Sequence, residues 1–310
     1  MTTASAPGKI ILFGEHAVVY GRPALAIPVT QVQATATVSK NSRGGIWIEA
    51  PNIALSCELS SLSPDHPLGS VINSVFSALR IVRPPACTVY LQSTIPVAAG
   101  LGSGAAVTVA ILRALSAFLG KPLPDEWVNK LAFEAEKLHH GTPSGIDNTV
   151  VTYARPVYFI KGQPIKPFRV GAAFTIVIGD TGISAPTKES VGAVRKLWEA
   201  EPFRWEKIFD RVGEIVWDAR QAIERGDTAE LGTQMDANQA LLQEMTVSSV
   251  ELDHLIQTAR KSGALGAKLS GGGRGGNMIA LVHKENAAAL AEALLSAGAK
   301  RAIVTTVQPK

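Results

Sequence analysis

A glycine-rich turn between a predicted strand and a predicted helix constrains this chain more than any other feature. Residues 96–106 read Pro-Val-Ala-Ala-Gly-Leu-Gly-Ser-Gly-Ala-Ala, with glycines at 100, 102 and 104. Glycines remove the side chains that would keep an anion away from backbone N–H groups, and the following helix directs its positive dipole end to the same place. Ser103 offers a hydroxyl there. The turn predicts a site for nucleotide phosphates, and a turn that serves packing alone is the alternative.

Two other phosphate-binding architectures do not fit this turn. A P-loop requires Gly-x-x-x-x-Gly-Lys followed by Ser or Thr, and no Gly-Lys pair in the chain completes that pattern. A dinucleotide-binding Rossmann turn requires Gly-x-Gly-x-x-Gly, with an acidic residue about 20 positions later. Here the spacing is Gly-x-Gly-x-Gly, and the next carboxylate is Asp125. The sequence therefore argues against a Rossmann domain.

The composition is that of a globular protein with about two domains. The chain has 310 residues, of which 46% are hydrophobic and 18% charged, enough to bury two cores. The net charge of +4 includes no run of five basic residues, which argues against nucleic-acid binding. Apolar segments are too short for a membrane span or a signal peptide, so we expect a cytoplasmic protein without membrane attachment. The two cysteines have no metal-ligand spacing.

Hydrophobic periodicity predicts an α+β chain that divides near residue 170. We expect a nucleotide- and metal-binding domain over residues 1–170 and a second domain over residues 171–310. The first is predicted to contain strands at 10–13, 29–38, 45–50 and 87–95, helices at 68–81, 105–119 and 125–139, and a returning pair of strands within 149–159. The second is predicted to contain strands at 173–178, 267–269, 277–282 and 301–307, with helices at 187–200, 204–225, 227–244, 248–262 and 285–297. With the middle helices taken as one crossover, the order of the second domain is the ferredoxin-like split arrangement.

A second motif lies near the N-terminus. Lys9 begins an apolar strand, and Glu15 and His16 lie in the turn that ends it. A lysine at a strand end is often simply solvated, and a histidine in such a turn often has only a structural partner. Buried polar groups there need a partner or a ligand, so all three residues are candidates for a functional site.

Two carboxylates flank a tight turn in the middle of the chain. Glu136 lies at the edge of the apolar face of a predicted helix, where a carboxylate should be paired. Mg²⁺ held together with nucleotide phosphates is a natural partner, and an ion pair on the helix flank is the alternative. Asp147 follows a turn rich in glycine and proline, so it is either a capping residue or a catalytic one. A phosphate turn and two carboxylates in one predicted domain favour catalysis.

A second glycine-rich segment joins two short apolar strands. Residues 266–276 read Gly-Ala-Lys-Leu-Ser-Gly-Gly-Gly-Arg-Gly-Gly, which is more glycine than a hairpin requires. Ser270 and the neighbouring N–H groups could form an anion-binding nest. A merely flexible loop is the alternative.

Together and in this order, the motifs resemble those of the GHMP kinase superfamily, and the resemblance spans nearly the whole chain. Residues 7–21 and 140–148 are most similar to the members that phosphorylate mevalonate, particularly short prokaryotic and archaeal ones. Residues 178–182, followed by Thr187-Lys-Glu, are similar to the same enzymes. The resemblance implies a ribosomal-S5-like N-terminal domain, a ferredoxin-like C-terminal domain and, frequently, a homodimer. It also implies ATP-dependent, Mg²⁺-assisted phosphorylation of the C5 hydroxyl of mevalonate in isoprenoid precursor biosynthesis.

The resemblance further implies roles for individual residues. Asp147 would be the base facing the C5 hydroxyl, with Lys9 as the cation beside it. Glu136 would hold Mg²⁺, and Ser103 is a second metal candidate. The mevalonate contacts would be Glu15, His16, Ser144, Thr187, Ser270, Gly271 and Gly272. The ATP phosphates would be enclosed by Pro96, Val97, Ala98, Ala99, Gly100, Leu101, Gly102, Ser103, Gly104, Ala105 and Ala106.

Three positions depart from the family pattern. Gly104 stands where members commonly have a second serine, so Ser103 or a water must supply that oxygen, or Glu136 carries more of the metal binding. Arg274 and Asn277 replace a small residue and a cysteine. Other enzymes on the same scaffold are the alternatives: phosphomevalonate kinase, homoserine kinase or diphosphomevalonate decarboxylase. A non-catalytic nucleotide or sugar sensor should have lost the acidic residues.

Overall fold

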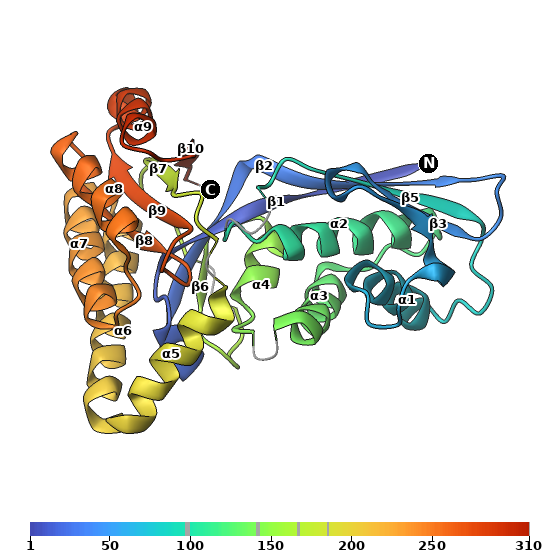
Figure 1. Ribbon diagram of the computed structural model, residues 1–310, viewed down its shortest axis with the longest axis horizontal. Helices are drawn as coiled ribbons and strands as arrows, with labels where there is room; N and C mark the ends of the chain where they lie inside the picture. The colour runs from blue at the N-terminus through green and yellow to red at the C-terminus, as the bar shows by residue number, and fades with distance from the viewer. Residues whose placement is uncertain (97–99, 141–142, 166–167, 185, 310) are drawn as a thin grey trace. The chain divides into compact units, whose positions relative to one another are not determined.

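The computed structural model describes residues 1–96, 100–140, 143–165, 168–184 and 186–309, with only the backbone described at 139 and 140. The chain forms two compact units (Figure 1). The first comprises Met1–Lys9, Pro28–Val97 and Leu101–Arg155, and the second comprises Ile10–Ile27, Ala98–Gly100 and Pro156–Lys310. The division thus passes through two long strands, β1 (Thr2–Phe13) and β2 (Ala24–Lys40).

The larger sheet has the strand order β1-β2-β5-β3-β4, and β6 pairs with the start of β2. Its other strands are β3 (Ile46–Ala50), β4 (Leu55–Glu58), β5 (Cys87–Ser93) and β6 (Val157–Phe159). Strands β3 and β5 are parallel, whereas β2 runs antiparallel to β5 and β6. In β5 every second side chain is buried, as expected of a sheet covered on one face.

Strand β1 begins eight residues earlier than the expected segment 10–13. Its first half consists of small polar residues without an apolar stripe, so periodicity did not predict it. Hydroxyl pairs join it to β2: Thr3 to Thr37 at 3.0 Å and Ser5 to Thr35 at 2.8 Å. Cross-strand pairs of this kind stabilise a sheet without hydrophobic side chains. The short strand β4 was also not predicted.

Helices α1 to α4 gather on one side of the part of this sheet that belongs to the first unit (Figure 1). Their bounds are α1 (Pro67–Leu79), α2 (Ser103–Phe118), α3 (Asp125–His140) and α4 (Ile146–Tyr153), and short 3₁₀ turns occur at Ala17–Tyr20, Pro51–Ile53, Leu59–Ser61 and Lys284–Asn286. Helix α2 contacts β5 and the other three helices, so it forms the centre of this core. Within the described ranges, no helix is long and apolar enough to cross a membrane.

The expectation of a strand pair within 149–159 is wrong in its first half, where the chain forms helix α4. The β-branched residues that suggested a strand are buried, and α4 contacts both α2 and α3. The hydroxyl of Thr149 donates to the carbonyl of Gly145, 2.7 Å away and four residues earlier, which satisfies it within the helix. Packing between helices therefore outweighs local β-propensity here.

The second unit contains a four-stranded antiparallel sheet of order β10-β7-β9-β8. This order confirms the expected ferredoxin-like split arrangement. Strands β7 and β9 lie in the middle of the sheet and are buried along their whole length. The elements are β7 (Phe174–Asp180), α5 (Thr187–Ala200), α6 (Pro202–Arg225), α7 (Thr228–Glu244), α8 (Val250–Lys261), β8 (Gly266–Ser270), β9 (Asn277–Val282), α9 (Ala287–Ser296) and β10 (Arg301–Val307).

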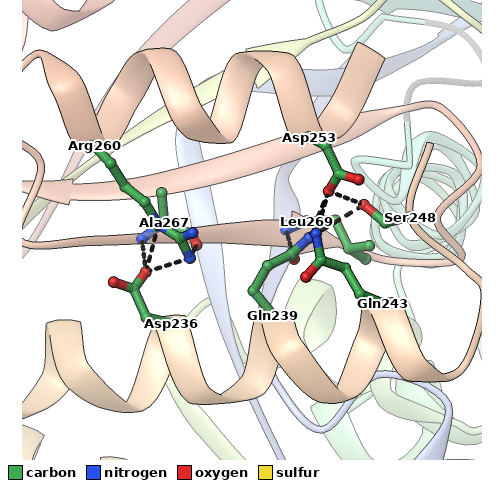
Figure 2. Close-up of polar contacts among 8 residues, drawn as sticks. All are labelled: Asp236, Gln239, Gln243, Ser248, Asp253, Arg260, Ala267 and Leu269. Atoms are coloured by element: carbon green, nitrogen blue, oxygen red, sulfur yellow. Dashed lines mark hydrogen bonds and ion pairs between the residues drawn. The ribbon is translucent and has the colours of Figure 1, made fainter. Parts of the chain in front are cut away.

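Side chains of α7 and α8 satisfy the open edge of strand β8 (Figure 2). The carboxylate of Asp236 accepts from the N–H of Ala267 at 2.9 Å and from the guanidinium of Arg260. The amide oxygen of Gln239 accepts from the N–H of Leu269 at 2.9 Å. A further hydrogen-bond set joins Gln239, Gln243 and Ser248 to Asp253. An edge strand with satisfied backbone groups is held in one register. This register fixes the position of Lys268, which lies between Ala267 and Leu269.

Candidate active site

In the first unit, the ammonium of Lys9 forms an ion pair with the carboxylate of Asp147 at 2.8 Å. Lys9 lies near the middle of β1 with a side chain that is only 5% exposed, whereas the Asp147 side chain is 32% exposed. Asp147 is in the first turn of α4, which follows the turn that begins at Gly145. The carboxylate is thus held by a buried cation and is open to a ligand. The structure brings together two residues that the sequence placed in one reaction.

The glycine-rich turn passes over the Lys9 side chain. The N–H of Lys9 donates to the carbonyl of Leu101 at 3.0 Å, and a Cβ on Gly102 would lie 2.7 Å from Cγ of Lys9. Gly102 has a φ of +71°, so both its conformation and its neighbour require glycine. Helix α2 begins at Ser103 immediately after it. The predicted phosphate residues Val97, Ala98 and Ala99 lie outside the described residues.

The unusual Gly104 lies in the first turn of α2, where a Cβ would meet no atom within 4 Å. A serine would therefore fit, and glycine is not required by the backbone. Ser103 is half-buried at the first position of the helix. The predicted residues Gly100, Leu101, Ala105 and Ala106 continue the turn and helix, and Ala106 donates its N–H to the carbonyl of Gly102 at 2.9 Å.

Glu136 on α3 belongs to the same cluster as Asp147. Burial first, and then the charge of Asp147, raise the pKa of Glu136 to about 8, although Lys9 acts in the opposite direction. A divalent cation would supply the positive charge that this pair of carboxylates lacks. No group of three or more His, Cys, Asp or Glu in the described part of the chain could hold a metal ion. Mg²⁺ needs only one or two carboxylates from a protein and completes its shell with phosphate oxygens and water, and Glu136 with Asp147 could supply them.

In the second unit, the chain turns sharply at Gly14, directly after β1. Gly14 has a φ of +94°, and a Cβ there would lie 2.5 Å from the carbonyl oxygen of Pro23, so only glycine fits. His16 also has a left-handed backbone with a φ of +61°. This turn places Glu15 and His16 beside the strand β8 and the loop that follows it, because each has a partner there.

Glu15 forms a buried ion pair with Lys268 of β8, and both side chains are fully buried. Burial lowers the pKa of Lys268, while the carboxylate of Glu15 opposes that shift. Sequence reasoning gave Lys268 no role, although a lysine between Ala267 and Leu269 in an apolar strand was a sign of a buried partner. Since Glu15 is buried against this partner, its role as a mevalonate contact stays a prediction.

His16 is held as a neutral side chain with a defined tautomer. Its Nε2–H donates to the carbonyl of Gly272 at 3.1 Å, and its Nδ1 has no hydrogen-bond partner within the described ranges. Burial lowers the pKa of His16 to about 4, and the charges of Arg274 and Lys268 contribute in the same direction. Nδ1 is thus a buried acceptor available to a donor group.

This burial predicts a loss of stability in mild acid. The unfolded chain binds a proton at a pKa of about 6.5, whereas folded His16 does so at about 4. The stability contributed above pH 6.5 is therefore lost as the pH falls towards 4, by on the order of 2 kcal/mol at pH 5. Urea titrations at pH 7 and pH 5 measure how far the free energy of unfolding falls between these pH values. This fall should be smaller for His16→Gln than for the parent. His254→Gln, at an exposed histidine of α8, should keep the parental difference; equal differences in all three proteins would contradict the assignment.

The other predicted substrate contacts are placed as follows. The hydroxyl of Ser270 donates to the carbonyl of Ile11 at 2.7 Å, so this proton already has an acceptor in β1. A Cβ on Gly272 would lie 3.3 Å from Thr187, so these two residues adjoin. Gly271 has a φ of +90° and open space at its Cβ position. In the first unit, the Ser144 hydroxyl accepts from the N–H of Ile146 at 3.3 Å, just before Asp147.

Asn277, the second departure in the last motif, begins β9 and is buried. Within the second unit, a Cβ on Gly100 would lie 3.5 Å from its Nδ2, so Asn277 adjoins Gly100.

Comparison with known proteins identifies the family of this chain. The GHMP kinases N terminal domain matches residues 70–155, and the GHMP kinases C terminal domain matches residues 219–300. The chain belongs to the GHMP kinase family, and it is an ATP-dependent kinase that acts on an alcohol. Among its relatives is the mevalonate kinase of Thermococcus gammatolerans, which is 39% identical over 95% of this chain and 93% of that protein.

Solved structures similar to this chain include a mevalonate kinase and a phosphomevalonate kinase. The L. major mevalonate kinase in complex with R-mevalonate has a TM-score of 0.86 at 31% identity, covering 100% of this chain and 97% of that one. A Streptococcus pneumoniae phosphomevalonate kinase has a TM-score of 0.85 at 17% identity, covering 99% and 100%. The second likeness concerns the fold alone, so the fold does not distinguish between substrates.

Proposed function

We propose that this chain transfers the γ-phosphoryl group of ATP to the C5 hydroxyl of mevalonate, giving 5-phosphomevalonate. The observation that carries the proposal is the 2.8 Å pair of Lys9 and Asp147 beneath the glycine-rich turn. The mevalonate kinases among its relatives support the choice of substrate. Mevalonate contacts at Glu15, His16, Ser144, Thr187 and the segment 270–272 are part of the proposal.

In this proposal Asp147 accepts the proton of the C5 hydroxyl, and Lys9 stabilises the developing alkoxide. Phosphoryl transfer requires little covalent chemistry from the protein, because most of the rate gain comes from positioning and charge stabilisation. Lys9 is buried, so its charge is less screened than at the surface. The N-terminus of α2 and the turn before it would bind the phosphates through their N–H groups.

Mg²⁺ is the proposed cofactor, and Glu136 would hold it, with Ser103 as the second candidate. When bound, the ion would neutralise charge on the β- and γ-phosphate oxygens. The assignment is supported by the position of Glu136 in the same cluster as Asp147, where burial and the neighbouring carboxylate raise its pKa and a cation would offset both effects.

The metal assignment predicts that Glu136→Gln raises the Mg²⁺ concentration needed for half-maximal binding of an ATP analogue by about 10-fold or more. The mevalonate requirement should change little. Calorimetric Mg²⁺ titrations with the analogue, alongside separate mevalonate titrations, measure the two quantities. Glu134→Gln, at an exposed carboxylate two residues away, is the matched control. Equal changes in both requirements would count against Glu136 as the metal ligand.

The remaining expectations stay proposals. These are a nucleotide- and metal-binding domain over residues 1–170, a second domain over 171–310, a cytoplasmic location and a homodimer.

The function is tested by measuring substrate-dependent ADP formation with mevalonate, phosphomevalonate, homoserine and galactose. Mevalonate should be the preferred acceptor by at least about 100-fold in kcat/KM. A site whose polar groups pair with one substrate leaves some of these groups unpaired when a different substrate binds. Release of CO₂ from diphosphomevalonate would indicate a decarboxylase instead. Turnover of phosphomevalonate or homoserine in preference to mevalonate would overturn the proposal.

A further inference from the structure

The loop between β8 and β9 has a fixed backbone. The N–H of Arg274 donates to the carbonyl of Val247 at 2.7 Å, and the N–H of Gly276 donates to the carbonyl of Ile183 at 2.9 Å. The carbonyl of Gly276 also accepts a hydrogen bond, from the N–H of Thr181 at 2.9 Å. These bonds hold the second half of the loop, so the backbone of Arg274 has a defined place.

Arg274 occupies a backbone position that suits glycine. Its φ is +61°, in the left-handed region that is unfavourable for a residue with a Cβ. A glycine at position 274, like the other residues of 271–276, would avoid this strain. The side chain is exposed and makes no ion pair with any residue that the structure describes. An arginine here is therefore explained by neither the backbone nor a structural partner.

The guanidinium of Arg274 supplies a positive charge near His16. The His16 ring is hydrogen-bonded to the carbonyl of Gly272 at 3.1 Å, and Arg274 follows two residues later in the same loop. The charges of Arg274 and Lys268 both lower the pKa of His16. The charge of Lys268 is balanced by Glu15 in the buried pair. His16 itself is neutral and joined to the same loop through Gly272. Of these two cations, Arg274 is the one available to a ligand.

We propose that Arg274 is a specificity-determining residue that binds the carboxylate of the substrate. This inference rests on the proposed function, because mevalonate carries a carboxylate at the end opposite its C5 hydroxyl. A guanidinium matches the two oxygens of a carboxylate and keeps its charge at every physiological pH. The neutral Nδ1 of His16, an acceptor, suits a substrate hydroxyl and not a carboxylate. The two groups thus read different parts of one hydroxy acid.

The test compares Arg274→Gly with Arg274→Lys by steady-state kinetics. Arg274→Gly should raise the KM for mevalonate by about 10- to 100-fold, the usual effect of losing a charge-assisted hydrogen bond, and leave the KM for ATP unchanged. Arg274→Lys should lie between this variant and the parent, since lysine keeps the charge but not the planar fork. Because glycine suits the backbone, the thermal midpoint of Arg274→Gly should not fall.

Arg80→Gly is a matched control. Arg80 is also exposed and left-handed, with a φ of +53° at the end of α1. Its replacement changes charge and backbone freedom in the same way and should leave both KM values unchanged.

A substrate analogue separates carboxylate binding from a general effect of charge. With 3-methylpentane-1,3,5-triol, which lacks the carboxylate, the parent and Arg274→Gly should have equal kcat/KM. An unchanged KM for mevalonate, a rise in the KM for ATP instead, or an equal loss with the triol would each overturn the inference. If the parent forms no mevalonate-dependent ADP, the proposed function fails and this inference fails with it. A parent active on mevalonate whose KM is insensitive to Arg274→Gly removes this inference alone.

Discussion

Asp147→Asn lowers turnover on mevalonate by about 10²- to 10⁴-fold, the usual contribution of a positioned general base. Asparagine keeps the size of the side chain but cannot accept the hydroxyl proton. Binding of an ATP analogue should be retained, because the glycine-rich turn and the start of α2 are unchanged. Single-turnover rates and analogue titrations measure the two effects separately.

Asp147→Asn also removes the negative charge that is paired with Lys9. Lys9 is buried and paired with Asp147, so the variant should also lose some stability, and its thermal midpoint must be recorded. Asp125→Asn is the matched control, because Asp125 forms a surface ion pair with Arg113 at 2.7 Å and should keep normal turnover. A folded Asp147→Asn protein with near-normal turnover would show that Asp147 is not the base.

Lys268→Met destabilises the second unit by about 3–5 kcal/mol, the usual cost of removing one member of a buried ion pair. Methionine fills a similar volume, so the loss comes from the charge that Glu15 keeps in a fully buried place. Urea denaturation at pH 7 measures the effect.

The double variant Glu15→Gln/Lys268→Met tests the cause of that loss. It should regain at least half of the lost stability, because a neutral amide does not need a counter-charge. Lys196→Met, at an exposed lysine of α5, should stay within about 0.5 kcal/mol of the parent. If Lys268→Met is as stable as the parent, the ion pair is not what holds the turn after β1 against β8.

Secondary structure was predictable where one face of an element carries a continuous apolar stripe. Helix α5 and the strands β9 and β10 have the bounds expected from periodicity. Prediction failed where the deciding contacts are distant. Residues 149–152 are β-branched and local propensity favours a strand, but contacts with α2 and α3 make them helical. The start of β1 has no apolar pattern by which it could be predicted, and hydroxyl pairs with β2 stabilise it instead.

The candidate site divides in the same way. Glycine-rich segments and isolated carboxylates are local features, so the turn at 96–106 and the residues Glu136 and Asp147 were evident in the sequence. Lys268 was not assigned, because its importance depends on a partner 253 positions away. The sequence also did not reveal that the partner of Glu15 is Lys268, or that His16 has one nitrogen bonded to Gly272 and the other available.

By itself the sequence determined the order of helices and strands in the second unit, the motifs and hence the family, since periodicity and short motifs depend on neighbouring residues. The tertiary structure decided which charges meet: Lys9 with Asp147, and Lys268 with Glu15. Such pairs form only when distant segments return to one place. Burial there removes water from Lys9, Lys268 and Glu15, so each of these charges depends on the partner that the fold provides.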